Sequence, residues 1–339
     1  MILNRKSCYA SVLLVLFLLF SCQHNRQDDR YADMPSELAE IYKKIDKNPS
    51  DLSLYFSLSD YYMKISLQDS ALNAILTALR IDSTNTTCYL KLSDVYFAMN
   101  HIDASEEMLE KVISMDGKNQ EAYLKLAELH FLHKRYDKAQ NFLQTALSID
   151  SYNPKAYFIW AWVYKEEGDT MSAIRSYLTA IEQDIDYFEA YEELAILYHH
   201  KKDPIAANYY KNALNIKPDD ILLMYNFAMF YQEMNDFDKA IMYYKMILQI
   251  NPSYKYALHN IAWIYMIEME RYEDAIAFFT NAIDIDNEYI EAIYNRGLAF
   301  ESLKQYDNAR QDYAYTLKLN DKYELGIEGL NRLDRLQSK

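Results

Sequence analysis

A pair of histidines, His130 and His133, is the first set of residues in this sequence whose types and spacing could do chemistry. Residues three apart lie on one side of a helix, so the two imidazoles could bind a metal ion there. His130, however, stands at a position that large rings occupy elsewhere in the chain, which favours a buried imidazole over a ligand. His199 and His200 are adjacent and would point to different sides of a helix. We therefore predict no metal site and no cofactor.

Paired carboxylates give no stronger indication of catalysis. Glu166 and Glu167 are adjacent, as are Glu192 and Glu193. Adjacent carboxylates cannot flank a scissile bond by themselves, so a solvated helix face explains both pairs. The chain also lacks the G-x-S-x-G, H-E-x-x-H, C-x-x-C and phosphate-loop motifs. We therefore predict that the protein is not an enzyme.

The elements that position every side chain come from a repeat. Five tyrosines recur at intervals of 34 residues: Tyr55, Tyr89, Tyr123, Tyr157 and Tyr191. Within one repeat, residues 221–254, two amphipathic helical patterns flank a turn at Asn235 and Asp236. The second pattern ends before Pro252, because a proline pushes the preceding residue out of the helical conformation.

Two series of small residues mark where the helices approach each other. The first lies in the middle of each first helix: Ser59, Ser93, Ala127, Ala161, Ala195, Ala228, Ala262 and Gly297. The second opens each second helix: Ala71, Ser105, Ala139, Ala173, Ala206, Ala240, Ala275 and Ala309. A ring follows three residues after each member of the first series: Tyr62, Tyr96, His130, Tyr164, Tyr198, Tyr231, Tyr265 and Phe300. Small side chains allow close approach, and the rings fill the space beside them.

Together these features resemble the tetratricopeptide repeat family, whose unit is a helix–turn–helix with the pattern W-x2-L-G-x2-Y, then A-x3-F, then P. The resemblance covers residues 52–323 as eight units, although tyrosine or an aliphatic residue replaces the first tryptophan. One unit is a residue short near Lys202 and one is a residue long near Glu270. The resemblance implies an all-α fold, a right-handed α-solenoid of about eight such units.

The segments that flank the repeats are predicted to be a tether and two capping helices. Residues 22–34 are polar and suit a tether. Residues 35–51 and 324–339 have amphipathic patterns and are the N- and C-terminal capping helices, because terminal repeats need a polar outer face. Gly326 and Gly329 lower the helix propensity of the last segment, so we expect it to fray.

Residues 1–21 have the features of a bacterial lipoprotein signal peptide. Arg5 and Lys6 precede an apolar run that is too short to span a membrane. The sequence LFSC at 19–22 resembles a lipobox, although phenylalanine replaces the usual small residue. The resemblance implies that Cys22 is lipidated and anchors the protein, and Gln23 after it favours the outer membrane, with the membrane face left open. A plain secretory signal and an uncleaved anchor are the alternatives.

The composition fits one elongated domain with few loops. The chain has 5 glycines and 6 prolines among 339 residues. Its net charge of −15 argues against nucleic acid as a partner, because nucleic-acid binding needs a basic surface. Cys88 is the one cysteine after residue 22, so no intramolecular disulfide is expected.

The resemblance also implies where a partner binds, because the first helices of this family line a concave groove. Asn226, Asn260 and Asn295 share one groove position in three successive units. A row of amides can pair with the backbone of an extended peptide, and this row resembles the asparagine ladder of the O-linked N-acetylglucosamine transferase. The other predicted peptide-binding residues are Tyr225, Met229, His259, Trp263, Tyr294, Phe158 and Trp162. The alternatives are that asparagine is simply common at this position and that about half of the rings pack between helices.

The basic clamp of chaperone-binding members is not matched, because Lys91 and Lys125 have the acidic residues Asp94 and Glu128 one helical turn further on. We therefore predict a membrane-anchored adaptor of the bacterial cell envelope that binds a protein or an extended peptide in its groove. The alternative is an envelope lipoprotein that binds glycans by stacking its tryptophans and tyrosines on sugar rings.

Overall fold

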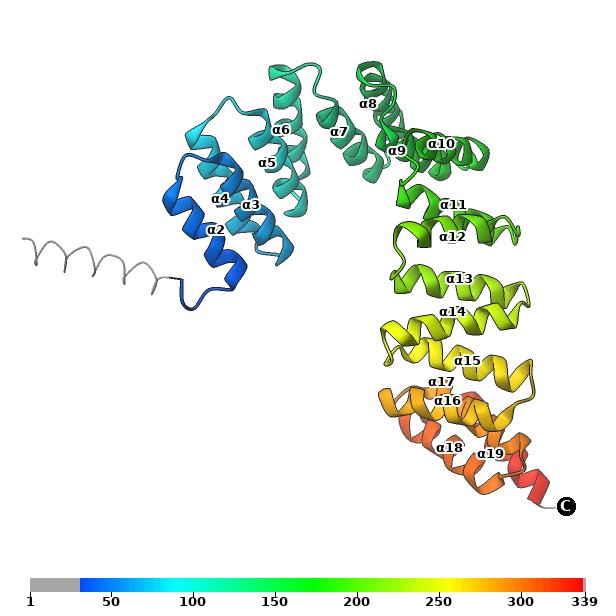
Figure 1. The fold of residues 1–339 in the computed structure, drawn as a ribbon. Coiled ribbons are helices and arrows are strands. Elements are labelled where there is room, and N and C mark those ends of the chain that lie inside the picture. The colour runs from blue at the N-terminus through cyan, green and yellow to red at the C-terminus, as the bar shows by residue number, and fades with distance from the viewer. Residues whose placement is uncertain (1–30, 338–339) are drawn as a thin grey trace, which may run out of the picture. The chain divides into compact units, whose positions relative to one another are not determined.

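The computed structural model describes residues 31–337, and in this range the chain forms 18 α-helices and no β-strand (Figure 1). The first eight helices are α2 (Ser36–Lys47), α3 (Leu52–Lys64), α4 (Gln68–Ile81), α5 (Thr86–Ala98), α6 (Ile102–Met115), α7 (Gln120–Leu132), α8 (Tyr136–Ile149) and α9 (Pro154–Glu166). The others are α10 (Thr170–Gln183), α11 (Phe188–His200), α12 (Ala206–Ile216), α13 (Ile221–Glu233), α14 (Phe237–Ile250), α15 (Lys255–Ile267), α16 (Tyr272–Ile285), α17 (Ile290–Ser302), α18 (Tyr306–Leu319) and α19 (Glu324–Gln337).

The predicted signal peptide, the lipidation site at Cys22 and the first part of the predicted tether lie outside the described residues. Within residues 31–337, no helix combines the length and the apolar character that a membrane crossing requires.

Consecutive helices pair into hairpins that repeat along the chain. The packed pairs are α3 with α4, α5 with α6, α7 with α8, α11 with α12, α13 with α14, α15 with α16, and α17 with α18. α9 and α10 take the corresponding place in the fourth repeat. α2 packs on α3 and α19 packs on α18, so an additional helix covers each end. The observed fold is the all-α solenoid of helix–turn–helix units that the sequence predicts.

By their internal contacts the helices of the described residues fall into two compact units, one up to residue 163 and the other from residue 164. The boundary lies within α9, near its C-terminal end. The first unit therefore contains α2 to α8 and most of α9, and the second contains α10 to α19.

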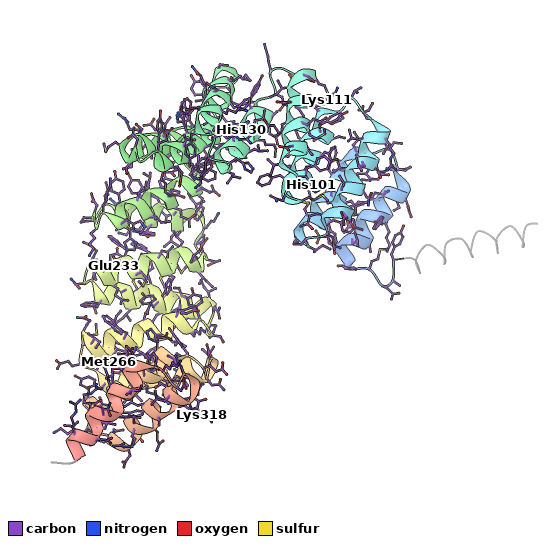
Figure 2. All side chains as sticks on the ribbon, turned by 180° about the vertical axis from the view of Figure 1, so that it is seen from behind. His101, Lys111, His130, Glu233, Met266 and Lys318 are labelled. Carbon is purple, nitrogen blue, oxygen red and sulfur yellow. The ribbon has the colours of Figure 1, made fainter. Side chains whose placement is uncertain are left out.

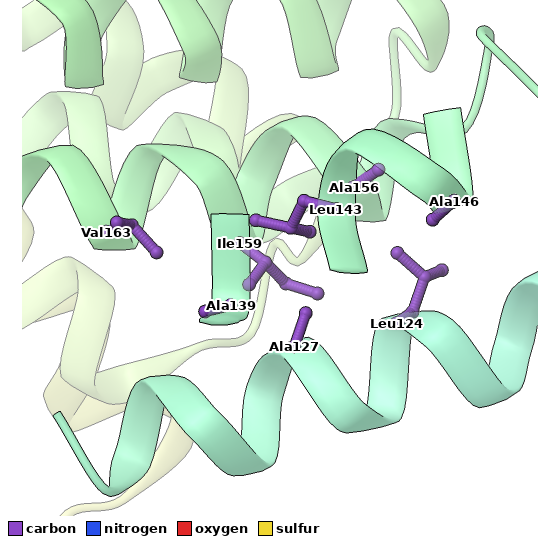
Figure 3. Close-up of a cluster of buried hydrophobic side chains, with 8 residues drawn as sticks. All are labelled: Leu124, Ala127, Ala139, Leu143, Ala146, Ala156, Ile159 and Val163. Carbon is purple, nitrogen blue, oxygen red and sulfur yellow. The ribbon is translucent and has the colours of Figure 1, made fainter. Parts of the chain in front are cut away.

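The small residues lie in the core of each unit, as predicted. All members of both small-residue series are buried. Figure 3 shows one core cluster of the first unit, in which Leu124 and Ala127 of α7 point toward a group that includes Leu143 of α8 and Ile159 of α9. A leucine in place of Ala127 would overpack this contact and cost about 1–3 kcal/mol.

Each hairpin turn passes through one residue in the left-handed conformation. These residues have φ angles from 51° to 82° and are Ser66, Asn100, Lys134, Gly168, Lys202, Asn235, Glu270 and Lys304. A residue with a side chain pays about 1–2 kcal/mol in this conformation, and Gly168 alone of the eight avoids that cost. The one-residue irregularities near Lys202 and Glu270 fall at these turns. α12, which follows the turn at Lys202, is 11 residues long, whereas most second helices have 14.

The ring of Tyr313 on α18 lies between two glycines at the C-terminal end. A Cβ atom on Gly297 of α17 would lie 2.7 Å from Cε1 of this ring, and one on Gly329 of α19 would lie 2.7 Å from Cδ2. Arg332 of α19 also donates two hydrogen bonds to the carboxylate of Glu301, at 2.7 and 2.8 Å. Gly329, which the sequence marks as a weak point of the last helix, therefore allows close packing of that helix.

Candidate binding surfaces on the first helices

Eight of the predicted binding residues come together on three first helices of the second unit. With Leu298 they form what we call the α13–α15–α17 face: Tyr225, Asn226 and Met229 on α13; His259, Asn260 and Trp263 on α15; Tyr294, Asn295 and Leu298 on α17. Each set has spacing i, i+1, i+4, which places its members on one side of a helix. Nδ2 of Asn260 lies 3.6 Å from Sδ of Met229, so the sets of adjacent repeats touch. The other two predicted residues, Phe158 and Trp162, belong to the first unit.

The start of each of these helices is fixed in a different way. The carboxylate of Asp220 accepts a hydrogen bond from the backbone N–H of Leu223 and caps α13. α15 and α17 begin after Tyr254 and Tyr289, whose side chains make no capping hydrogen bond. The rings of these two tyrosines pack against the face instead.

The ring at the fifth position of each first helix is held between two other rings. The three sets are Tyr225 with Tyr244 and Tyr254, His259 with Phe279 and Tyr289, and Tyr294 with Tyr313 and Tyr323. The ring centroids are 5.2 to 5.9 Å apart, and each such pair contributes about 0.5–1.5 kcal/mol beyond the area that it buries. These rings are therefore used largely in packing, and Tyr294 is only 9% exposed.

Asn260 uses its amide inside the protein. Its Nδ2 donates to the hydroxyl of Tyr244 at 2.9 Å and to the hydroxyl of Tyr225 at 3.0 Å. The fully buried Tyr244 in turn donates to Oε1 of Gln232 at 3.0 Å. A buried polar group without its partner costs about 1–3 kcal/mol. Asn260 therefore completes the hydrogen bonding of buried tyrosines, and its two amide hydrogens are not free for a ligand.

His259 connects two of the asparagines. Its Nε2 lies 3.1 Å from Nδ2 of Asn295, and its Nδ1 lies 3.2 Å from Oδ1 of Asn260. Because an amide nitrogen only donates, Nε2 accepts and Nδ1 carries the proton that it donates to Asn260. Burial lowers the pKa of His259 and outweighs the opposing effects of the Asn260 hydrogen bond and of the Glu291 carboxylate. The arrangement therefore requires and favours the neutral imidazole.

Asn226 differs from the other two asparagines. Within residues 31–337 its side chain makes no hydrogen bond, and it is half-buried. Met229, Trp263 and Leu298 are also half-buried, so they form the accessible part of the face with Asn226.

Sequence reasoning missed a series of aromatic side chains on the second helices, of which Tyr244, Phe279 and Tyr313 pack against this face. The members of the series recur at intervals of 33 to 35 residues and are fully buried: Tyr177, Tyr210, Tyr244, Phe279 and Tyr313. The hydroxyl of Tyr210 lies 2.9 Å from Nδ1 of His199, and that of Tyr313 donates to Glu301 at 2.6 Å. Aliphatic residues take this position in the first unit, namely Ile75, Leu109 and Leu143. The regular spacing was the signal that would have revealed the series.

The first unit contains a pocket of about 290 Å³ that is lined by both first and second helices, besides pockets of about 360 and 400 Å³ nearer its N-terminal end. The lining of the pocket of about 290 Å³ comes from α5, α6, α7 and α9: Ser93, Asp94, Phe97, Ser105, Leu109, Lys125, Glu128, Leu129, Leu132 and Trp162. The ring of Trp162 is stacked on Phe131 with centroids 5.5 Å apart and contacts Phe158 at 4.7 Å. Phe158 is 6% exposed and belongs to the core, so of these two predicted residues Trp162 is the one that lines the pocket.

The lysines on this side form ion pairs between repeats. Nζ of Lys91 lies 2.7 Å from Asp60, and Nζ of Lys125 lies 2.6 Å from Asp94. From the sequence, the nearest acidic neighbours considered were those one turn further on the same helix, Asp94 for Lys91 and Glu128 for Lys125. The hydrogen-bonded partners instead lie one repeat earlier, because adjacent first helices pack side by side.

His130, which is labelled in Figure 2, is fully buried and is therefore a core residue, as its place in the repeat predicts. Its ring is stacked on Phe142 at 5.3 Å, and Nε2 lies 3.4 Å from Oε1 of Glu106. Burial lowers the pKa of His130, and the Glu106 carboxylate offsets this only in part. His133 is exposed, and in residues 31–337 no group of three histidine, cysteine or acidic side chains is placed to hold a metal ion.

Stacked helical hairpins, with small buried residues at each helix contact, define a helical repeat scaffold. Family models described as tetratricopeptide repeat match residues 219–288, residues 104–157, and residues 86–119 and 290–323. The chain belongs to the tetratricopeptide repeat family. Proteins built from these repeats act as scaffolds that bind protein partners.

Several known structures and sequences are similar to parts of this chain. The C-terminal part of a TPR repeat-containing protein from Cytophaga hutchinsonii is 17% identical, with a TM-score of 0.63 over 71% of this chain and 99% of that one. A crystal structure of MamA is 26% identical, with a TM-score of 0.39 over 48% of this chain and 95% of that one. Serine/threonine-protein phosphatase 5 of Rattus norvegicus is 31% identical over 94 residues, which are 27% of this chain and 19% of the phosphatase. The chain thus spans about a fifth of that relative.

Proposed function

We propose that the protein is a lipid-anchored adaptor of the bacterial cell envelope that holds a segment of a partner protein against the α13–α15–α17 face. The observation that carries this proposal is that no Asp, Glu, Lys or Arg is among the nine residues of the face, although these types make up 25% of the whole chain. The cores of protein interfaces are depleted of charge and enriched in aromatic residues and methionine. A partner can therefore cover this face without burying an unpaired charge.

The roles of the individual residues follow from what each already contacts. Met229, Trp263 and Leu298 are half-buried and supply apolar contact area to a partner. Asn226 is the amide that hydrogen-bonds the partner's backbone, because Asn260 already hydrogen-bonds within the protein. Within residues 31–337, Asn295 donates one hydrogen bond, to His259, so Asn226 is the amide with the fewest internal partners, and the proposed recognition depends on it beside the apolar anchors.

The membrane anchor is proposed from the sequence. Residues 19–22 resemble a lipobox, and each buried CH2 of an attached acyl chain contributes about 0.8 kcal/mol to membrane binding. Replacement of Cys22 by serine should move the protein from the membrane fraction to the soluble fraction of lysed cells. A Cys22→Ser protein that stays with the membrane would refute the lipid anchor.

Partner binding is tested by placing charge on the face. We expect Asn226→Lys/Met229→Lys to lose proteins that co-purify with the wild type from detergent-solubilised envelope. The matched control is Met242→Lys/Met246→Lys, which puts the same charges on methionines of α14 that are 45% and 36% exposed. Thermal unfolding of both variants checks that they fold. If both double variants keep the partners that the wild type binds, the face is not the binding site. Binding of the purified wild-type protein to a glycan array would instead support the carbohydrate alternative.

A further inference from the structure

The pocket of about 290 Å³ in the first unit has an apolar floor. Leu109 and Leu129 are 1% and 3% exposed, and both line it. Two serines also line the floor, but their hydroxyl hydrogens are already used. Ser93 donates to the carbonyl of Leu90 at 2.7 Å, and Ser105 donates to the carbonyl of Ser93 at 2.9 Å. The floor therefore offers a ligand contact area without hydrogen-bond donors.

Two apolar side chains at the pocket are open to solvent. Phe97 is 41% exposed and Leu132 is 55% exposed, and Trp162 contributes a half-buried ring. The volume of about 290 Å³ lies at the lower end of the range of roughly 300–1,000 Å³ that small-molecule sites occupy. The pocket therefore suits one or two side chains of a protein segment better than a cofactor.

The charged groups at the pocket leave a negative excess. Lys125 pairs with Asp94 at 2.6 Å and lies 3.7 Å from Glu121, and Lys155 pairs with Glu128 at 3.0 Å. Among the charged groups that line the pocket, two carboxylates, Asp94 and Glu128, thus face one ammonium group, that of Lys125. The side chains of Asp94 and Glu128 are 42% and 28% exposed, whereas that of Lys125 is 19% exposed. A ligand in the pocket therefore meets Asp94 and Glu128 before it meets Lys125, while Lys155, the partner of Glu128, is 43% exposed but does not line the pocket.

We propose that this pocket binds a bulky apolar side chain from a partner segment that carries a lysine or arginine next to it. The apolar group enters between Phe97, Leu132 and Trp162, and the cation lies at Asp94 and Glu128. Such a partner also complements the net charge of −15, which would steer it toward the protein. The proposal rests on the proposed function only in requiring a protein partner, since it concerns a different unit and different residues.

The probes for this site are three acetylated, amidated octapeptides that differ in charge or in apolar content. They are Gly-Ser-Lys-Phe-Leu-Lys-Ser-Gly, the same peptide with both lysines replaced by glutamate, and the same peptide with Phe-Leu replaced by Ala-Ala. In protein labelled with 5-fluorotryptophan, the ¹⁹F signal of Trp162 reports on the pocket, and Trp160, which does not line the pocket, serves as a reference. We expect the basic Phe-Leu peptide to shift the Trp162 signal and to bind at least tenfold more tightly than either of the others.

A pair of matched double variants tests the pocket itself. Phe97→Ser/Leu132→Ser should weaken binding of the basic peptide at least tenfold. The control Ile65→Ser/Leu67→Ser removes side chains of similar exposure, 45% and 49%, that do not line the pocket, and should leave binding unchanged.

Several results would overturn the proposal. They are equal binding of the acidic and basic peptides, no shift of Trp162 at millimolar peptide, or equal loss in the two double variants. A Trp162 signal that responds to laurate but to no peptide would identify a lipid site instead. None of these results bears on the α13–α15–α17 face, so the two proposals can fail separately.

Discussion

Replacement of Asn260 by alanine should destabilise the second unit even though the side chain lies on a predicted binding face. The amide makes three hydrogen bonds, to Tyr244 at 2.9 Å, to Tyr225 at 3.0 Å and to His259 at 3.2 Å. Each contributes about 0.5–1.5 kcal/mol net, so we expect the variant to lose about 2–4 kcal/mol of unfolding free energy. At 2 kcal/mol the unfolding temperature of a unit of this size falls by roughly 4–8 °C.

Asn226→Ala is the control, because Asn226 holds the same repeat position with no hydrogen bond inside residues 31–337. We expect its unfolding free energy to stay within about 0.5 kcal/mol of the wild type. Urea titrations give both values, and hydrogen exchange of α13 and α15 shows where the loss occurs. Near-equal stabilities of the two variants would refute the assignment of Asn260 to the interior network. If Asn260→Ala is destabilised as expected, the loss of a partner by this variant does not by itself show that Asn260 contacts the partner.

Three further predictions follow from the same structure. Burial lowers the pKa of His259 below its unfolded value near 6.5. The contribution of the neutral imidazole to the unfolding free energy should therefore be complete above pH 6.5 and decrease as the pH drops toward the folded pKa. His259→Gln should flatten this dependence in urea titrations between pH 5 and 8. Gly329→Ala should cost about 1–2 kcal/mol by urea titration because its Cβ meets the Tyr313 ring, whereas Gly117→Ala, whose Cβ would have 3.8 Å to its nearest neighbour, should be neutral; equal effects would contradict the packing argument. Lys304→Gly should raise the unfolding temperature by relieving a left-handed φ of 59°, a gain of about 0.5–1 kcal/mol, and Gly168→Ala should lower it.

The helical framework could be predicted from sequence because its signals are local and repeat. The 34-residue period and the two series of small residues fix which faces of the helices meet. Each of those residues is buried in the structure. A small buried side chain such as that of Ala240 allows two helices to approach closely, so its structural role follows from its position in the repeat.

The state of the candidate site could not be predicted in the same way. Asn226 and Asn260 are the same residue type at the same repeat position. Within residues 31–337 the amide of Asn226 makes no hydrogen bond, whereas that of Asn260 is bonded to tyrosines 16 and 35 residues away. Such partners depend on residues in other helices, and a position-by-position comparison of repeats does not contain them. Gly329 shows the same limit, because the need for a glycine there comes from the ring of Tyr313, which packs against it from α18.

The most direct test of the account is a photo-crosslinker at the α13–α15–α17 face. p-Benzoylphenylalanine replaces Trp263 on first helix α15 in one protein and Phe278 on second helix α16 in another, and both native side chains are half-buried. After irradiation in intact envelope, we predict a specific adduct with a partner protein from position 263 and none from position 278. Adducts from position 278 alone, or equal adducts from both, would contradict the claim that the first helices bind the partner.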